Sequence, residues 1–84
     1  MKLVYFAWLR ERLGINEEEV SLPADVTTIA ELLSWQKSRD ERFADVFEHS
    51  DIIQVAIDQK HVLSREAKLE DAKEIAMFPP MTGG

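Results

Sequence analysis

The residues whose types could act together chemically stand at the end of the sequence: Phe78, Pro79, Pro80, Met81, Thr82, Gly83 and Gly84. The two prolines fix φ and lack a backbone donor, so they end a strand and favour an extended course. The two glycines have no side chain and suit a backbone that must approach another surface closely. The pattern predicts a thin tail that threads a narrow channel and presents the carboxylate of Gly84 to a partner enzyme. A frayed chain end is the alternative.

Other chemistry has little support in the sequence. The chain has no cysteine, which excludes a thiolate nucleophile, a disulfide framework and a cysteine-based metal site. His49 and His61 lack ligand spacing, so we expect no metal. No nucleophile elbow, phosphate loop or paired-carboxylate cleft is visible, and we expect a domain that is not a catalyst by itself. The missing disulfides are consistent with a reducing cytoplasm, the location we predict.

Composition predicts one small domain with one core, because the chain has 84 residues and a hydrophobic content of 45%. The net charge of −6 argues against nucleic acid, whose binding requires lysine and arginine, and favours a partner with a basic docking face. We expect no signal peptide. The longest apolar run, Leu3 to Leu9, is too short to span a bilayer, so a membrane is not an expected partner.

The first half of the chain predicts two strands that precede the helices. Lys2 to Trp8 is rich in aromatic and β-branched residues and predicts the first strand. Leu9 to Leu13 predicts a helical turn that Gly14 stops. Glu17 to Leu22 predicts the second strand, and we interpret its Glu17–Glu19 run as a solvated edge.

Two capping patterns predict the helices. Thr28-x-x-Glu31 is a capping box that opens the main helix. Its apolar stripe follows helical spacing: Ile29, Leu32, Leu33 and Gln36. Ser38-x-x-Glu41 predicts a second cap, followed by a short helix with Phe43, Val46 and Phe47 at helical spacing. The acidic residues of this segment predict a solvated face: Asp40, Glu41, Asp45, Glu48 and Asp51.

The second half predicts three more strands. The segments are Ile52 to Asp58, a short strand at His61-Val62-Leu63 after an Asp58-Gln59-Lys60 turn, and Glu74 to Phe78. Leu69 pins the polar connection before the last strand. The first and last strands are the most apolar, so we expect them side by side in the sheet centre. The order predicts an α+β fold with a sheet of about five strands and with one main helix and a short second helix packed on one face.

This order with a Gly-Gly end resembles the ubiquitin-like β-grasp fold. The opening Lys2 to Glu11, the closing Glu74 to Gly84 and the Val55-Ala56-Ile57-Asp58-Gln59 hairpin resemble the MoaD family, the sulfur-carrier small subunits of molybdopterin synthases. The family commonly has Asn where Asp58 stands, and Gly-Asp where Ala72-Lys73 stand. A turn that needs a positive φ would be strained at Ala72. The resemblance divides the chain into a β-grasp domain, 1–79, and an extended tail, 80–84.

The resemblance also implies a function and partners. An activating enzyme would adenylate Gly84 with ATP, a sulfur donor would displace AMP to leave a thiocarboxylate, and the chain itself would bind no cofactor. The tail, from Pro79 to Gly84, would enter the large synthase subunit in a two-plus-two assembly. Its sulfur would go to a cyclic pyranopterin monophosphate, and two rounds would build the dithiolene of molybdopterin.

The surface around the tail is predicted as a docking patch of Phe6, Phe78 and His61. Both phenylalanines fall on the sheet face opposite Tyr5 and Met77, which lacks a covering helix in a single-helix β-grasp fold. Ordinary core is the alternative for the phenylalanines, and a lone exposed histidine for His61. Three rival functions stay open: a Gly-Gly carrier for thiamin, cysteine or tRNA thiolation, a ubiquitin-like modifier conjugated to lysines, and a binding module with an inert tail.

Overall fold

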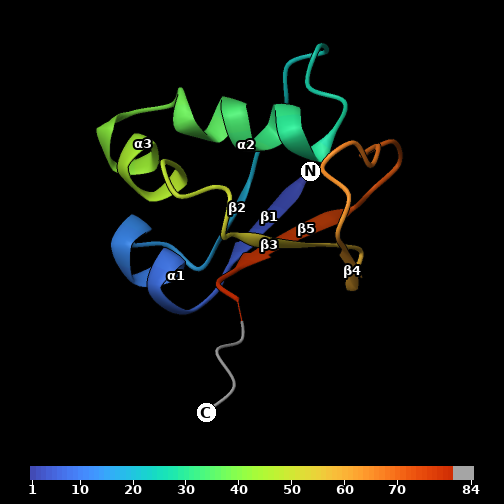
Figure 1. Cartoon of the computed structure of the whole chain (residues 1–84). Helices are drawn as coiled ribbons and strands as arrows, with labels where there is room; N and C mark the ends of the chain where they lie inside the picture. Colours follow the sequence, from blue (N-terminus) through green and yellow to red (C-terminus); the bar gives the residue numbers. More distant parts are fainter. Residues whose placement is uncertain (81–84) are drawn as a thin grey trace.

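The computed structural model describes residues 1–80, which form a five-stranded sheet and three helices (Figure 1). The strands are β1 (Lys2–Tyr5), β2 (Glu17–Glu19), β3 (Gln54–Ile57), β4 (Lys60–Val62) and β5 (Glu74–Phe78). The helices are α1 (Ala7–Leu13), α2 (Ile29–Lys37) and α3 (Glu41–Phe47). The sheet has the order β2-β1-β5-β3-β4, so β5 is its middle strand.

The first and last strands lie side by side, as the sequence predicted. β1 and β5 are parallel, with Leu3 opposite Ile75 and Tyr5 opposite Met77. The other three pairings, β1 with β2, β3 with β5 and β3 with β4, are antiparallel. Because successive strand residues point to opposite faces, these four apolar side chains share one face of the sheet.

The core lies between that face and the helices. α2 and α3 cover the sheet on one side, and α1 packs beside α3 (Figure 1). The core side chains come from all of these elements: Leu3, Tyr5, Leu9, Leu13, Ile29, Leu32, Phe43, Val46, Phe47, Val55, Ile75 and Met77. No helix of residues 1–80 covers the other face, which we call the open face. The predicted α+β, β-grasp architecture is confirmed, and α1 is a helix in addition to the two that were expected.

The predicted first strand, Lys2 to Trp8, is too long. β1 ends at Tyr5, and α1 begins at Ala7, which has a φ of 54°. Leu9 and Leu13 are four residues apart and both fully buried, because a helix places this spacing on one face, here against α3. Gly14 ends the helix as predicted, in the left-handed conformation, and its N–H donates to Arg10 O at 2.9 Å.

The second predicted strand, Glu17 to Leu22, is also too long. β2 contains only Glu17–Glu19, because its antiparallel partner β1 begins at Lys2, which lies opposite Glu19. Beyond that pair, Val20 N–H donates only to Met1 O, at 2.9 Å. The solvated-edge interpretation holds for two of the three glutamates, since Glu17 and Glu19 are exposed while Glu18 is half-buried.

One helix cap was predicted correctly and the other was wrong. Thr28 and Glu31 form the capping box, in which Thr28 Oγ1 accepts from the Glu31 amide at 3.2 Å. α3 is capped by Asp40, whose Oδ1 accepts from the Phe43 amide at 3.0 Å. Ser38 still belongs to the end of α2, where its hydroxyl donates to Trp35 O at 2.7 Å. Asp40 is therefore the first residue free to cap α3.

The α2 and α3 surfaces follow the sequence pattern. All four residues of the predicted α2 stripe are buried: Ile29, Leu32, Leu33 and Gln36. The three apolar residues of α3 are buried as well: Phe43, Val46 and Phe47. The acidic residues predicted to be solvated are exposed: Asp40, Glu41, Asp45, Glu48 and Asp51.

The predicted hairpin is present, but its first strand is shorter than expected and its second strand begins one residue earlier. β3 covers Gln54–Ile57 and β4 covers Lys60–Val62, and Asp58 and Gln59 form the connection with φ values of 47° and 71°. Two positive φ values are the signature of a type I′ turn, which suits the twist of a hairpin. Leu69 is buried as predicted, and β5 covers the predicted Glu74–Phe78.

The departures from the family pattern cause no strain at Ala72. Ala72 has a negative φ, and the positive φ of this connection lies at Glu70, at 37°. Asp58 Oδ1 accepts from the amides of Lys73 and Glu74, both at 2.9 Å, so its carboxylate holds the start of β5 against the hairpin turn.

Candidate functional site

The tail leaves the middle of the sheet. We call Phe78, Pro79 and Pro80 the tail root. Phe78 is the last residue of β5 and faces Gln54 of β3, while β1 has already ended at Tyr5, opposite Met77. Pro79 is half-buried and Pro80 is exposed. The residues predicted to follow into a partner channel, Met81, Thr82, Gly83 and Gly84, lie outside the described residues, as does most of the predicted 80–84 tail.

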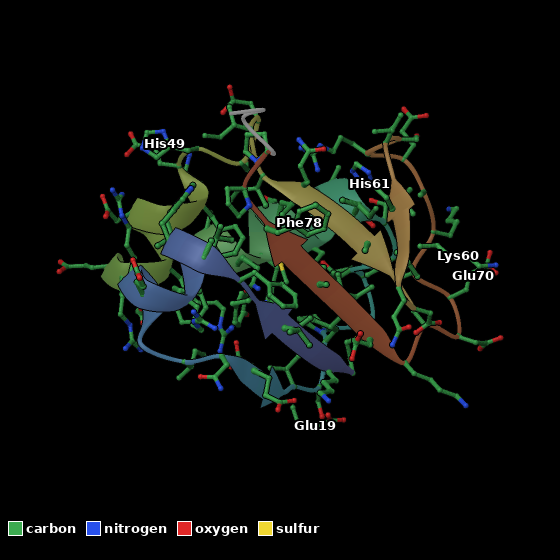
Figure 2. All side chains as sticks on the ribbon, turned by 90° about the horizontal axis from the view of Figure 1, so that it is seen from below. Glu19, His49, Lys60, His61, Glu70 and Phe78 are labelled. Carbon is green, nitrogen blue, oxygen red and sulfur yellow. The ribbon has the colours of Figure 1, made fainter. Side chains whose placement is uncertain are left out.

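The open face presents the three side chains that the sequence singled out. We call Phe6, Phe78 and His61 the open-face patch. Phe6 is 46% exposed, so it is not a core residue. Phe78 is half-buried, and its ring centroid lies 5.5 Å from that of His61 (Figure 2). The structure thus brings His61 of β4 against the tail root. A docking role for the patch stays a prediction.

Two further residues lie along the same face and were not recognised from sequence as part of a site. Gln54 Oε1 lies 3.0 Å from His61 Nε2, and Gln54 is the register partner of Phe78. Leu63 is 81% exposed one residue beyond β4, where strand alternation places it on the face of His61. The signal for Gln54 was available, because it stands between Ile53 and Val55, whose side chains point into the core.

On the helix-covered face of the sheet, next to Met77, lies a partly buried polar cluster, which we call the Tyr5 network. Its members are Tyr5 of β1, Glu18 of β2, Gln36 of α2 and Arg39. The Tyr5 hydroxyl donates to Glu18 Oε2 at 2.6 Å and accepts from Gln36 Nε2 at 2.7 Å. Tyr5 is 1% exposed and Gln36 is fully buried. No buried side-chain nitrogen or oxygen atom of residues 1–80 lacks a partner.

Arg39 completes the network from the loop between α2 and α3. Its two terminal nitrogens donate to the two carboxylate oxygens of Glu18, at 2.7 and 2.9 Å, and Nη1 also donates to Gln36 Oε1 at 2.9 Å. Such a two-pronged, charge-assisted contact is stronger than a neutral hydrogen bond and fixes orientation. The guanidinium also lies 3.9 Å from the ring centroid of Phe43 and 4.8 Å from that of Trp35.

The environment fixes the ionisation states of the network. Burial, followed by the hydrogen bond to Glu18, raises the pKa of Tyr5 above its ordinary value, so its hydroxyl stays neutral and donates. The hydrogen bonds from Arg39 lower the pKa of Glu18, and the Tyr5 hydroxyl adds to this effect. The hydrogen bond to Glu18 raises the pKa of Arg39 in turn. At neutral pH the network therefore holds one carboxylate and one guanidinium.

Sequence reasoning did not find this network. Glu18 was read as part of a solvated run and Gln36 as part of an apolar stripe. The pairing of the folded strands separates Glu18 from its neighbours. In the antiparallel pair with β1, Glu18 stands opposite Leu3 and so faces the helices, while Glu17 and Glu19 face away from them.

Two features are absent from residues 1–80. No group of three or more histidine, aspartate or glutamate side chains gathers where it could hold a metal ion. None of the helices in this part of the chain has the length and apolar character needed to cross a membrane.

Comparison with known proteins relates the chain to sulfur carriers. A family model described as the ThiS family matches residues 3–84. The molybdopterin synthase sulfur carrier subunit of Escherichia coli strain K12 is 33% identical over 84 residues, which cover 100% of this chain and 99% of that protein. The subunit of the same name from Haemophilus influenzae is 29% identical with the same coverage.

Solved structures share the fold. SAMP1 from Haloferax volcanii superposes with a TM-score of 0.69 at 27% identity, covering 100% of this chain and 98% of that chain. A putative molybdopterin converting factor, subunit 1, from Pyrococcus furiosus superposes with a TM-score of 0.66 at 23% identity, covering 94% of each chain. The second likeness, at this low identity, speaks to the fold alone.

Proposed function

Since this chain belongs to the ThiS family, we propose that it is the sulfur carrier subunit of a molybdopterin synthase and carries sulfur on Gly84. The observation that supports this most is the alignment with two sulfur carrier subunits of that enzyme over the whole chain, Gly84 included. The bacterial relatives are small subunits, in keeping with a chain that donates sulfur and leaves the catalysis to its partners.

The chemistry starts from an unreactive group. A terminal carboxyl has an ordinary pKa of about 3.5, so at neutral pH Gly84 carries a carboxylate, which is a poor electrophile. In the proposed cycle, a carboxylate oxygen attacks the α-phosphorus of ATP on an activating enzyme and expels pyrophosphate. The donor's sulfur, at the oxidation level of hydrosulfide, then attacks the acyl carbon and expels AMP. The product is a C-terminal thiocarboxylate.

The second half of the cycle consumes the sulfur. The loaded tail enters the large synthase subunit, and its sulfur is transferred to a cyclic pyranopterin monophosphate. Water supplies the oxygen that returns Gly84 to a carboxylate, and a second loaded carrier provides the other sulfur of the dithiolene. The chain itself needs no bound cofactor in this scheme, because the activating enzyme uses the ATP. We propose a two-plus-two assembly with the large subunit.

The described residues give this scheme a physical basis. The tail root leaves a central strand that is paired to β3 up to Phe78, so the tail has a firm base. Pro79 and Pro80 restrict φ and reduce the entropy lost when an extended tail enters a channel. The open-face patch stands beside this exit, with Phe6 46% exposed, and exposed aromatic residues are frequent anchors of protein interfaces. We assign this patch to the contact with the large subunit.

A second candidate follows from the family itself. The model that matches residues 3–84 describes the ThiS family, so a Gly-Gly carrier for another thiolation pathway would share the loading chemistry. The two candidates differ in the acceptor of the sulfur and therefore in the enzyme that discharges the tail.

Intact mass spectrometry tests both steps. The chain is incubated with its activating enzyme, ATP and a sulfur donor, next to a variant that lacks Gly84. We expect a mass gain equal to replacing one oxygen by sulfur, located at Gly84 by fragmentation and missing in the variant. Adding the large subunit and the pterin precursor should then restore the original mass. If the chain never gains sulfur, its role as a sulfur carrier is refuted. If the loaded chain keeps its sulfur in the presence of the large subunit and the pterin precursor, the chain belongs to another thiolation pathway.

A further inference from the structure

The Tyr5 network touches both strands that hold the tail root. Tyr5 is the last residue of β1 and immediately precedes Phe6, and its register partner Met77 immediately precedes Phe78. Gln36 Nε2, which donates to the Tyr5 hydroxyl at 2.7 Å, also lies 3.8 Å from Met77 Sδ. Each phenylalanine of the open-face patch therefore follows a residue that the network holds from the opposite face of the sheet.

A backbone bond joins the ends of the two strands at this point, in addition to their ladder. Phe6 N–H donates to Met77 O at 3.1 Å, and directly afterwards the chain turns into α1 at Ala7. Phe78, the residue after Met77 in β5, is paired with a strand on one side, where it lies opposite Gln54 of β3. β1 therefore holds the end of β5 through the Tyr5–Met77 register pair, the Phe6–Met77 bond and the side chains packed beneath them.

The network is also sensitive to the loss of one member. Its hydrogen bonds lie in a part of the molecule where Gln36 is fully buried and Tyr5 nearly so. A buried polar group that loses its partner is costly, because no water replaces the bond. The Glu18 carboxylate is the acceptor on which both the Tyr5 hydroxyl and the Arg39 guanidinium converge.

From these contacts we infer that the Tyr5 network is a positioning element for the tail, which holds Phe6 and Phe78 in register and so fixes where Pro79 leaves the sheet. Glu18, on an edge strand that β1 separates from β5, is then a positioning residue for the loading of Gly84. The expected effect on the loading of Gly84 rests on the proposed function. The expected effect on the position of Phe6 and Phe78 rests on the contacts alone.

The Glu17–Glu19 run supplies a matched pair of variants. Glu18→Gln and Glu19→Gln each remove one negative charge from the same strand, but only Glu18 belongs to the network. Glu19 is exposed, pairs with the terminal amine at 3.1 Å, and lies on the edge of the sheet away from Phe78 (Figure 2). Tyr5→Phe is a second network variant, which keeps the ring and removes the hydroxyl.

Amide hydrogen exchange measures the structural consequence. The reporter is the Phe6 N–H, bonded to Met77 O, and the internal reference is the Asp58 N–H, bonded to Glu74 O at 2.9 Å at the other end of β5. Global unfolding would speed the exchange of both amides alike. We expect Glu18→Gln and Tyr5→Phe to speed exchange of Phe6 relative to Asp58 by about tenfold, since bonds to a charged group are strong, and Glu19→Gln to leave the ratio unchanged.

Adenylation kinetics measure the functional consequence, with pyrophosphate release followed well below the melting temperature. We expect the two network variants to lower the maximal rate by about tenfold at saturating carrier while KM changes by less than about threefold, as for a tail that binds but is misplaced. Glu19→Gln should match the unchanged protein. An unchanged Phe6 exchange ratio in both network variants would overturn the inference. So would a lowered rate that Glu19→Gln shares. If the protein without any substitution is not adenylated at all, the proposed function is refuted instead. The ratios of amide exchange would still decide the inference about the Tyr5 network.

Discussion

Replacing Phe6 by alanine should weaken docking on the large subunit and still leave a folded chain. Phe6 stands on the open face at the end of β1, beside the tail root, and its amide is bonded to Met77 O at 3.1 Å. The substitution keeps this backbone bond and removes the ring. It therefore tests the patch without touching the tail that carries the chemistry.

The magnitude follows from the surface that Phe6 leaves uncovered. It is 46% exposed, about 90 Å² if a fully covered aromatic residue buries about 200 Å². At about 25 cal/mol per Å², complete burial by a partner contributes about 2 kcal/mol, which is about 30-fold in Kd. The covered half of the ring contributes to folding, so we expect a loss of about 1–2 kcal/mol in the free energy of unfolding.

Isothermal titration calorimetry with the large subunit measures the change in Kd, at a temperature where urea titration shows each variant folded. Val26→Ala is the control, because Val26 is half-buried in the loop between β2 and α2, on the side away from the tail root (Figure 1). It should cost stability without changing Kd. A Phe6→Ala protein that binds within about twofold of the unchanged chain would refute the argument from exposed area, and the open-face patch would lose its assigned role.

Substitutions at three positions test the fold that supports the site. Thr28→Ala removes the acceptor of the capping box and should lower the free energy of unfolding by about 1 kcal/mol in urea titrations. Glu18 has a lowered pKa in the folded state, so its stabilisation is present above the ordinary glutamate pKa and is lost as pH falls through the folded value. The stability difference between the unchanged chain and Glu18→Gln should accordingly be largest near neutral pH and vanish in acid. Asp58→Asn keeps an acceptor for the amides of Lys73 and Glu74 and tolerates the positive φ, so it should be nearly neutral, whereas Asp58→Ala should cost about 1–3 kcal/mol in thermal unfolding.

Features that depend on neighbouring residues were predictable from the sequence. The capping box of Thr28 and Glu31, the buried α2 stripe, the glycine that ends α1 and the hairpin turn at Asp58 are all present. β5 has the predicted bounds, because a compact apolar run stands between a polar connection and two prolines. Each of these features depends on a few residues that are close together in the sequence, so their composition and spacing are sufficient to predict it.

Features that depend on residues distant in the sequence could not be predicted from it. The segment after Tyr5 has the composition of a strand, yet it is helical because Leu9 and Leu13 are buried beside α3. The cap of α3 is Asp40 rather than Ser38, since α2 extends far enough to use the Ser38 hydroxyl.

The order of the main elements and the family could be predicted from the residues alone, because they lie in local residue patterns and in a likeness that covers the chain. The tertiary structure was needed to show that Glu18, one of three consecutive glutamates, is half-buried and bonded to Tyr5 and Arg39. It was also needed to show that Phe6 is 46% exposed and that the rings of Phe78 and His61 lie together. Burial of a side chain is a property of what packs against it, and those neighbours come from strands and helices that are remote in sequence.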